Sequence, residues 1–383
     1  MKDNRREFIK KGSTLAAAMS IGGISSSIPK PLDQKKKARL IKPYVKDAGI
    51  KFAFLMGPTS PKVPFAKQIG VGYAVSGVIS NPDLKPWDPK AIIATKEAWD
   101  KEGIKWAVVE GPPSLHTQTK FGLSGKDEEI SNFITLIKNL KQYGGVDIIC
   151  YNWMPLNSLA RTDRAAPIRG GALMIAFDYE LVKDAPLTEY GVVTKESLWK
   201  NLEYFLKAVV PEAEKIGMKL SLHPDDPQVD SLQGISRIMT SVENFDRMLA
   251  IYPSKSNGVT MCQANFSLMG ADIPTLVRRW GKDVINFVHF RNIQDLSGVV
   301  PSTKFIETFH DEGQIDMYEA MKAYYDIGFT GPMRPDHVPT MTTEVGADQS
   351  VWPYRNRAMY GHLFAIGYFR GLAESVAKNG SKA

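Results

Sequence analysis

The chain has 383 residues, of which 43% are hydrophobic and 23% are charged, and its formal net charge is +7. These proportions are those of a soluble globular enzyme, and the length suffices for one large α/β barrel or two ordinary domains. The charge does not indicate a nucleic-acid partner, because residues 1–42 hold eleven Lys or Arg and three Asp or Glu, a balance of +8. The rest of the chain therefore carries about −1 and offers no basic face.

The first thirty residues resemble an export signal. Arg5 and Arg6 are followed by the aromatic Phe8, two positions after Arg6, and a weakly apolar stretch rich in Ala, Gly and Ser follows at 14–28. That stretch is too short and too polar to span a membrane. We predict a twin-arginine signal peptide over 1–30, a polar linker over 31–45 and a periplasmic protein without stable membrane insertion after signal removal. The protein is cytoplasmic if the signal does not function.

Eight short apolar runs follow and indicate β-strands. Most are continuously apolar, which is typical of parallel strands buried on both faces. The predicted strands cover residues 51–56, 71–79, 104–111, 146–153, 219–223, 258–262, 284–291 and 331–336.

Helix signals lie between most of these runs. Asp88-Pro89 marks one helix start and Gly103 its end. The predicted helices cover residues 88–102, 126–143, 195–216, 241–251, 273–280, 315–327 and 357–377. This alternation predicts a (β/α)₈ TIM barrel over 46–383 with an extended loop after the fourth strand. We interpret that loop, 154–194, as a lid or substrate-binding element with a hairpin around Gly170-Gly171.

Four potential metal ligands lie at the ends of the last four predicted strands: His223, Cys262, His289 and Asp336. The carboxyl ends of barrel strands converge on one mouth, so these side chains are expected to meet. Imidazole, thiolate and carboxylate together suit Mn²⁺, Fe²⁺, Co²⁺ or Zn²⁺ rather than Mg²⁺ or Ca²⁺. A single histidine is more often structural, but four such residues at consecutive strand ends favour a metal site.

Two neighbouring features bear on this site. Asp225 or Asp226 is expected to accept the second N–H of a metal-bound histidine. Cys150, also at a strand end, is interpreted as a buried apolar residue, and a Cys150–Cys262 pair remains an alternative in an oxidising compartment.

A series of motifs in the chain resembles the mannonate dehydratase family of xylose-isomerase-like TIM barrels, from about residue 50 to the C-terminus. The motifs are CYNWMP (150–155), RTD (161–163), LHPDDP (222–227), CQAN (262–265), VHFRN (288–292), FHDEGQIDM (309–317) and RPDH (334–337). The resemblance implies Mn²⁺ or Fe²⁺ bound by the same four residues. It also implies loss of water from D-mannonate to give 2-keto-3-deoxy-D-gluconate.

The resemblance also suggests roles at the mouth. His337 is the first candidate for proton transfer, with Tyr354 or Tyr360 as its partner. A guanidinium fork matches a carboxylate, so Arg161, Arg291 and Arg334 are candidates for holding the substrate. The remaining candidate substrate-binding residues are His116, Asn152, Asp163 and His310, although His310 is equally well explained as part of a polar loop.

The sequence departs from the family pattern on the substrate side. AFLMG at 53–57 replaces RWYG, His116-Thr117 replaces His-Glu, and Leu159-Ala160 precedes RTD where the family has Trp. Three alternatives therefore stay open: a dehydratase of another aldonic acid, a sugar isomerase or epimerase, and a periplasmic carbohydrate-binding protein with a vestigial site. The expected partner is a small sugar acid, and a homo-oligomer is left open.

Overall fold

The computed structural model describes residues 47–155, 159–344 and 358–380. Its centre is a closed barrel of eight parallel strands in the order β1-β14-β11-β10-β7-β4-β3-β2. The strands are β1 (Lys51–Leu55), β2 (Tyr73–Val75), β3 (Lys105–Glu110), β4 (Ile148–Asn152), β7 (Lys219–His223), β10 (Asn257–Cys262), β11 (Ile285–His289) and β14 (Pro332–Arg334). Each of the eight overlaps a predicted strand, although β2 and β14 are shorter than predicted, and the TIM barrel is confirmed.

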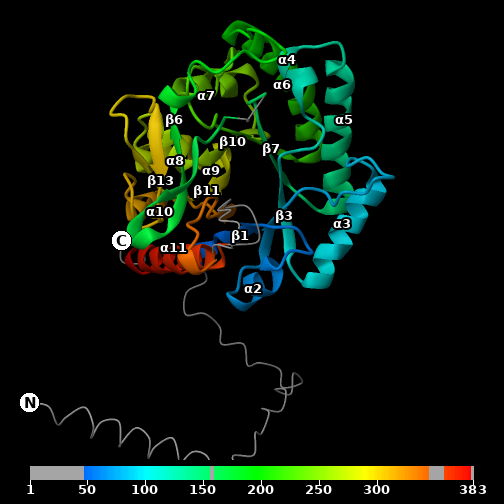
Figure 1. Ribbon diagram of the computed structural model, residues 1–383. Coiled ribbons are helices and arrows are strands. Elements are labelled where there is room, and N and C mark those ends of the chain that lie inside the picture. Colours follow the sequence, from blue (N-terminus) through cyan, green and yellow to red (C-terminus); the bar gives the residue numbers. More distant parts are fainter. Residues whose placement is uncertain (1–46, 156–158, 345–357, 381–383) are drawn as a thin grey trace, which may run out of the picture. The chain divides into compact units, whose positions relative to one another are not determined.

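Helices surround the barrel, with α3, α5 and α6 on one side and α10 and α11 on the opposite side (Figure 1). The predicted helices appear as α3 (Pro89–Glu102), α5 (Lys126–Asn139), α6 (Lys195–Ile216), α7 (Val242–Ile251), α9 (Ile273–Val284), α10 (Met317–Asp326) and α11 (Met359–Gly380). Their ends follow from local chemistry. The Asp88 carboxylate accepts a hydrogen bond from the Lys90 N–H, and Gly103 ends α3 at φ +67°.

Three short helices were not predicted: α2 (Lys62–Gln68), α4 (Thr117–Phe121) and α8 (Gln263–Leu268). Each has seven residues or fewer and follows a barrel strand. Helical periodicity needs more turns than these segments contain, which explains why the sequence did not reveal them.

A four-stranded antiparallel sheet stands beside the barrel, in the order β12-β13-β6-β5. The extended loop after β4 supplies β5 (Asp163–Pro167) and β6 (Leu173–Asp178), joined by a turn at Arg169–Gly171, as the predicted hairpin requires. The loop after β11 supplies β12 (Ile293–Asp295) and β13 (Lys304–Glu307), which were not predicted. Figure 1 shows β6 and β13 side by side, and Phe305 pairs with Phe177 across them. We call these four strands the cover sheet.

The core has two layers that fix the barrel. Between strands and helices lies the larger layer, which includes the buried Phe54, Trp106, Phe205 and Phe290. A smaller buried cluster, including Ala53, Val108 and Ile148, contains the barrel residue Cys150. Both cysteines are free and buried, so the alternative disulfide does not form.

The predicted signal and linker, 1–45, lie outside the described residues. Among the helices that the structure describes, none is long and apolar enough to span a bilayer.

Candidate metal centre and active site

The four predicted ligands come together at the carboxyl end of the barrel. Cys262 and His289 are register partners on β10 and β11. The ligand atoms of His223, Cys262 and His289 all lie within 4.8 Å of one another. Asp336 Oδ2 is 3.5 Å from His289 Nδ1 and 4.0 Å from Cys262 Sγ. Two imidazoles and one thiol therefore converge, and the Asp336 carboxylate adjoins two of these three groups.

The backbone of Asp336 is unusual. It lies two residues beyond β14 and has a φ of +37°, in the left-handed region that non-glycine residues rarely adopt. The predicted strand 331–336 therefore ends early, at Arg334. Strain of this kind persists only where surrounding contacts enforce it, and it is concentrated at functional sites.

The two histidines are held by different partners. His223 Nδ1 lies 2.7 Å from the Pro224 carbonyl oxygen and its Nε2 lies 3.2 Å from His289 Nδ1. The expected carboxylate partner, Asp225 or Asp226, is therefore wrong for His223. Asp225 instead accepts a hydrogen bond from the Met239 N–H. On the other side of the His289 ring, Glu110 Oε1 lies 3.5 Å from Nε2.

Two arginines predicted to hold substrate are engaged by buried carboxylates. Arg161 donates to both oxygens of Asp226, at 2.7 and 2.9 Å, and to Glu307 at 2.5 Å. Arg291 lies 2.7 Å from Asp336 Oδ2, 3.2 Å from Glu307 and 3.3 Å from Asp226. Freeing either arginine for a substrate would leave a buried carboxylate uncompensated.

Arg334 is committed in the same way. Its NH2 group lies 2.7 Å from both Glu110 and Asp336, and its Nε donates to His289 Nε2 at 3.1 Å. The sequence located these arginines at the site but not their partners. In the structure the three arginines compensate the charge of the carboxylates around the cluster.

The charges of this group do not balance. Four carboxylates, buried for Glu307 and Asp336 and partly buried for Glu110 and Asp226, meet three guanidinium groups. These seven groups sum to one negative charge, which a proton on His289 offsets in the absence of metal, and Cys262 as a metal-bound thiolate would add a second negative charge. A divalent cation would neutralise that excess, so the residues fit a metal of this charge.

The pKa directions agree with this balance. Burial alone raises the pKa of Glu110, but Arg334 and His289 outweigh it and lower the pKa to about 2. Burial and Arg334 depress the pKa of His289, yet Asp336 and Glu110 raise it to about 9. A field that retains a proton on a buried imidazole also attracts a metal cation.

His337, the predicted proton-transfer residue, is fixed by a carboxylate. Its Nδ1 lies 2.5 Å from Glu307 Oε2, while Nε2 is 3.8 Å from Asp336 Oδ1. Glu307 is fully buried at the end of β13. A carboxylate on Nδ1 fixes the imidazole tautomer and orientation, as it does for general bases.

A cavity of about 430 Å³ opens onto the cluster. His223, His289 and Asp336 line it together with His337, Arg161 and Asn152. The Asn152 side-chain oxygen accepts a hydrogen bond from Lys120 Nζ at 3.0 Å. This volume is in the range of small-molecule sites.

Other predicted site residues lie elsewhere. Exposed His116 meets the Pro113 carbonyl oxygen at 2.6 Å and lines a separate hollow with Trp87. Exposed Asp163 accepts a hydrogen bond from the Ala165 N–H. Tyr360 is 55% exposed on the first turn of α11. The cavity reaches none of these three.

Two predicted site residues remain, His310 and Tyr354. His310 is completely buried against the Phe369 ring, and burial lowers its pKa to about 4. It is a neutral core residue behind the site rather than a cavity residue. Tyr354 lies outside the described residues.

Sequence reasoning missed Glu110, Glu307 and Lys120. Glu110 ends β3, a strand end of the kind that identified the ligands, and that position was the available signal. Glu307 lies on a strand that was not predicted, and Lys120 lies on the unpredicted α4. Buried Lys120 donates to Asn152 Oδ1 and to the Met154 carbonyl oxygen, and so supports the cavity wall.

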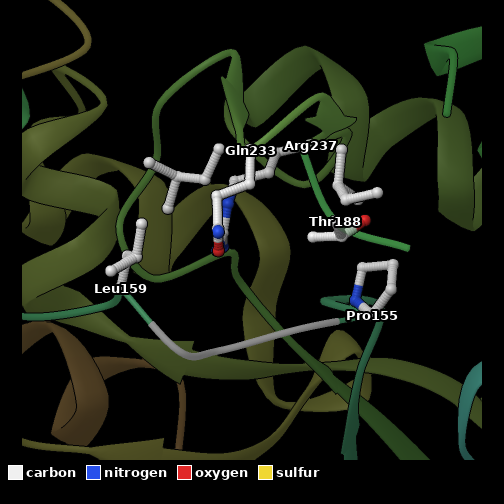
Figure 2. Close-up of a pocket in the computed structure, with 7 residues that line it drawn as sticks. Pro155, Leu159, Thr188, Gln233 and Arg237 are labelled. Atoms are coloured by element: carbon white, nitrogen blue, oxygen red, sulfur yellow. The ribbon is translucent and has the colours of Figure 1, made fainter. Parts of the chain in front are cut away.

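A second cavity is too small for a sugar acid. It has a volume of about 10 Å³, close to that of one water, and lies between Leu159, Thr188 and Arg237. Gln233 projects into it between Leu159 and Pro155 (Figure 2). The larger cavity at the cluster is therefore the candidate substrate site.

The fold and site define a class: a TIM barrel with a His, Cys and carboxylate cluster at the carboxyl ends of its strands. Solved structures with the same fold include a xylose isomerase domain protein from Planctomyces limnophilus, with a TM-score of 0.54 at 10% identity. An L-ribulose 3-epimerase has a TM-score of 0.53 at 12% identity. Identities this low show the fold alone.

Closer likenesses identify the family. The D-mannonate dehydratase (UxuA) family matches residues 57–189 and 184–383, and the chain belongs to this family. It is 34% identical over 331 residues to a mannonate dehydratase of Streptococcus uberis, covering 79% of this chain and 91% of the relative. The mannonate dehydratase structure from Streptococcus suis serotype 2 has a TM-score of 0.74 at 29% identity, covering 87% of this chain and 95% of that one. The predicted family is confirmed.

Proposed function

We propose that this protein is a hydro-lyase that removes water from D-mannonate to give 2-keto-3-deoxy-D-gluconate. One observation carries the proposal: in a member of the mannonate dehydratase family, His223, Cys262 and His289 converge beside a cavity of about 430 Å³, with Asp336 next to two of them. The epimerase alternative is supported only by the shared fold.

His223, Cys262, His289 and Asp336 would hold the divalent metal. Nitrogen, sulfur and oxygen donors in one cluster favour a transition metal such as Mn²⁺ or Fe²⁺ over Mg²⁺ or Ca²⁺. When bound, the metal supplies a Lewis acid next to the carbon that loses its proton.

The chain's own residues supply proton transfer. His337 lines the cavity, and the Glu307 carboxylate orients its ring through Nδ1, so Nε2 is the atom we assign to take the proton from C2 of the sugar acid. The departing C3 hydroxyl takes up a proton and leaves as water. The enol that results becomes the 2-keto product by gaining a proton at C3. Tyr354 stays the proposed acid partner from the sequence, since Tyr360 faces solvent.

The test is a product assay. We expect protein loaded with Mn²⁺ or Fe²⁺ to convert D-mannonate into a thiobarbiturate-reactive 2-keto-3-deoxy acid, with other aldonic acids converted more slowly. Metal analysis of the purified protein distinguishes Mn from Fe. Activity on another aldonic acid but not on D-mannonate would change the substrate, and inactivity on all of them with metal bound would refute the dehydratase.

We also propose export to the periplasm through the twin-arginine route, on the strength of Arg5-Arg6 and the small-residue stretch after them. Cell fractionation of the protein with both arginines changed to lysine tests this, since the change should retain it in the cytoplasm. The oligomeric state stays open, and light scattering would determine it.

A further inference from the structure

Lys62 is a buried lysine that contacts no carboxylate within the described part of the chain. It begins α2, directly after β1, and only 2% of its surface is exposed. Lysine is almost never fully buried unless it is paired. Among the residues that the structure describes, its ammonium group has no hydrogen bond or ion pair. Glu344 is near enough to attract it but not to contact it.

Lys62 lines a cavity on the same rim of the barrel as the metal cluster. This cavity, of about 440 Å³, lies between the segment 55–60 after β1 and the segment 76–79 after β2. Leu55 lines both this cavity and the one at the cluster, so the two hollows adjoin. Arg334, which contacts His289, also repels the Lys62 ammonium. The lysine therefore lies near the cluster.

A sugar acid brings a carboxylate to this mouth, and the arginines there are already occupied. Arg161, Arg291 and Arg334 each contact two or more carboxylates. Lys62 has no such commitment. Burial, followed by the charge of Arg334, lowers the pKa of Lys62 to about 8. An anion bound beside the Lys62 ammonium group would give it an ion-pair partner, which it does not have among the described residues.

We propose that Lys62 binds the carboxylate of the substrate and so selects sugar acids over neutral sugars. This inference rests on the proposed function, because it presumes a sugar-acid substrate. A charge-assisted hydrogen bond is among the stronger polar contacts, and losing it would weaken binding about 10- to 100-fold.

The test compares Lys62→Met with Lys67→Met in the full-length, metal-loaded protein. Lys67 lies on the same helix but is exposed and pairs with Glu102 at 3.2 Å, which makes it a matched control. Methionine has nearly the length of lysine without its charge, so the buried site stays filled. Thermal unfolding and metal content should be unchanged or improved in Lys62→Met.

Two readouts are used, KM for D-mannonate and calorimetric binding of two probes. D-gluconate is the acid probe and D-mannitol the neutral one. In Lys62→Met we expect KM and the Kd for gluconate to rise about 10-fold or more, with the Kd for mannitol unchanged. Lys67→Met should match the unaltered protein.

Two outcomes would overturn the proposal: unchanged gluconate binding in Lys62→Met, or equal loss for gluconate and mannitol. The second would indicate a structural role. The binding comparison needs no turnover. A protein that binds gluconate through Lys62 but does not dehydrate D-mannonate would therefore refute the proposed function alone.

Discussion

The sulfur of Cys262 tests the metal centre with a change of one atom. Cys262 is fully buried, and its Sγ lies 3.0 Å from Asn265 Oδ1. We expect Cys262→Ser to lower bound metal and to reduce turnover about 100-fold or more, because a hydroxyl is a poor substitute for a thiolate ligand. Serine can keep the contact with Asn265, so the free energy of unfolding should fall by only about 1 kcal/mol. Metal analysis, kinetics and thermal unfolding measure these effects.

Cys150→Ser is the matched control. Cys150 is also buried at a barrel strand, and its Sγ, the Glu110 carboxylate and the His289 ring form a second group within 4.8 Å. We expect Cys150→Ser to keep its metal and its turnover. If Cys150→Ser loses metal while Cys262→Ser retains it, the cation belongs to the second group and our assignment is wrong.

Single residues were predictable here where their chemistry has few other uses. Histidine and cysteine at strand ends are rare enough to indicate a metal site, and the structure brings His223, Cys262 and His289 together. Acidic residues are common, so Glu110 and Glu307 gave no comparable signal. The arginines were placed at the mouth correctly, but a sequence does not tell whether a guanidinium faces a substrate or a buried carboxylate.

Glu307, at the end of β13, ties the cover sheet to the barrel. It contacts Arg161 at 2.5 Å, Arg291 at 3.2 Å and His337 Nδ1 at 2.5 Å. Glu307→Gln should cost about 3 kcal/mol of unfolding free energy, because two buried arginines lose a countercharge. Turnover should also fall about 10- to 100-fold, since His337 loses the carboxylate that fixes its ring. Urea unfolding and steady-state kinetics at saturating metal measure both.

Glu312→Gln provides the comparison for that change. Glu312 pairs with Arg169 at 3.2 Å, and both side chains are about a third exposed or more. An exposed pair contributes about 0–1 kcal/mol, so this variant should remain close to the unaltered protein. Equal effects of the two substitutions would show that Glu307 has no special role.

The elements were predictable in proportion to their burial and length. The eight barrel strands were found because parallel strands buried on both faces are continuously apolar. Strands β12 and β13 were missed because they have three and four residues and include Asp295, Lys304 and Glu307. The partner of β13 outside its own loop, β6, lies over a hundred residues earlier in the chain, and no local pattern indicates such a pairing.

At the scale of the whole molecule, two buried neutral histidines make stability depend on pH. Burial, followed by the Lys62 charge, lowers the pKa of His362 to about 3, and burial lowers that of His310 to about 4. Unfolded histidines have a pKa of about 6.5. Between these values the unfolded chain binds more protons than the folded one, so stability falls as the pH decreases below about 6.5.

We expect His362→Phe to make this dependence less steep. The variant takes up one proton fewer on unfolding. The slope of its unfolding free energy against pH should therefore be smaller by about 1.4 kcal/mol per pH unit between about pH 6 and pH 4.5. A phenyl ring suits this position, because the His362 ring already packs edge-on against Phe54, with the two ring centroids 4.8 Å apart. Urea unfolding at several pH values gives both slopes, and equal slopes would show that His362 takes up no proton on unfolding.

Strand β14 occupies a special position, since it pairs with β1 on one side and β11 on the other. It is the last strand of the barrel to leave the ribosome, and the segment 334–337 that contains its end carries Arg334, Asp336 and His337. Pairing of this last strand with both β1 and β11 closes the barrel. The same step brings in Asp336, the fourth predicted ligand, and His337, the proposed proton-transfer residue. Closing the barrel and completing the set of four predicted ligands are thus one event, and a truncated chain that stops before residue 332 would lack both the closed barrel and Asp336.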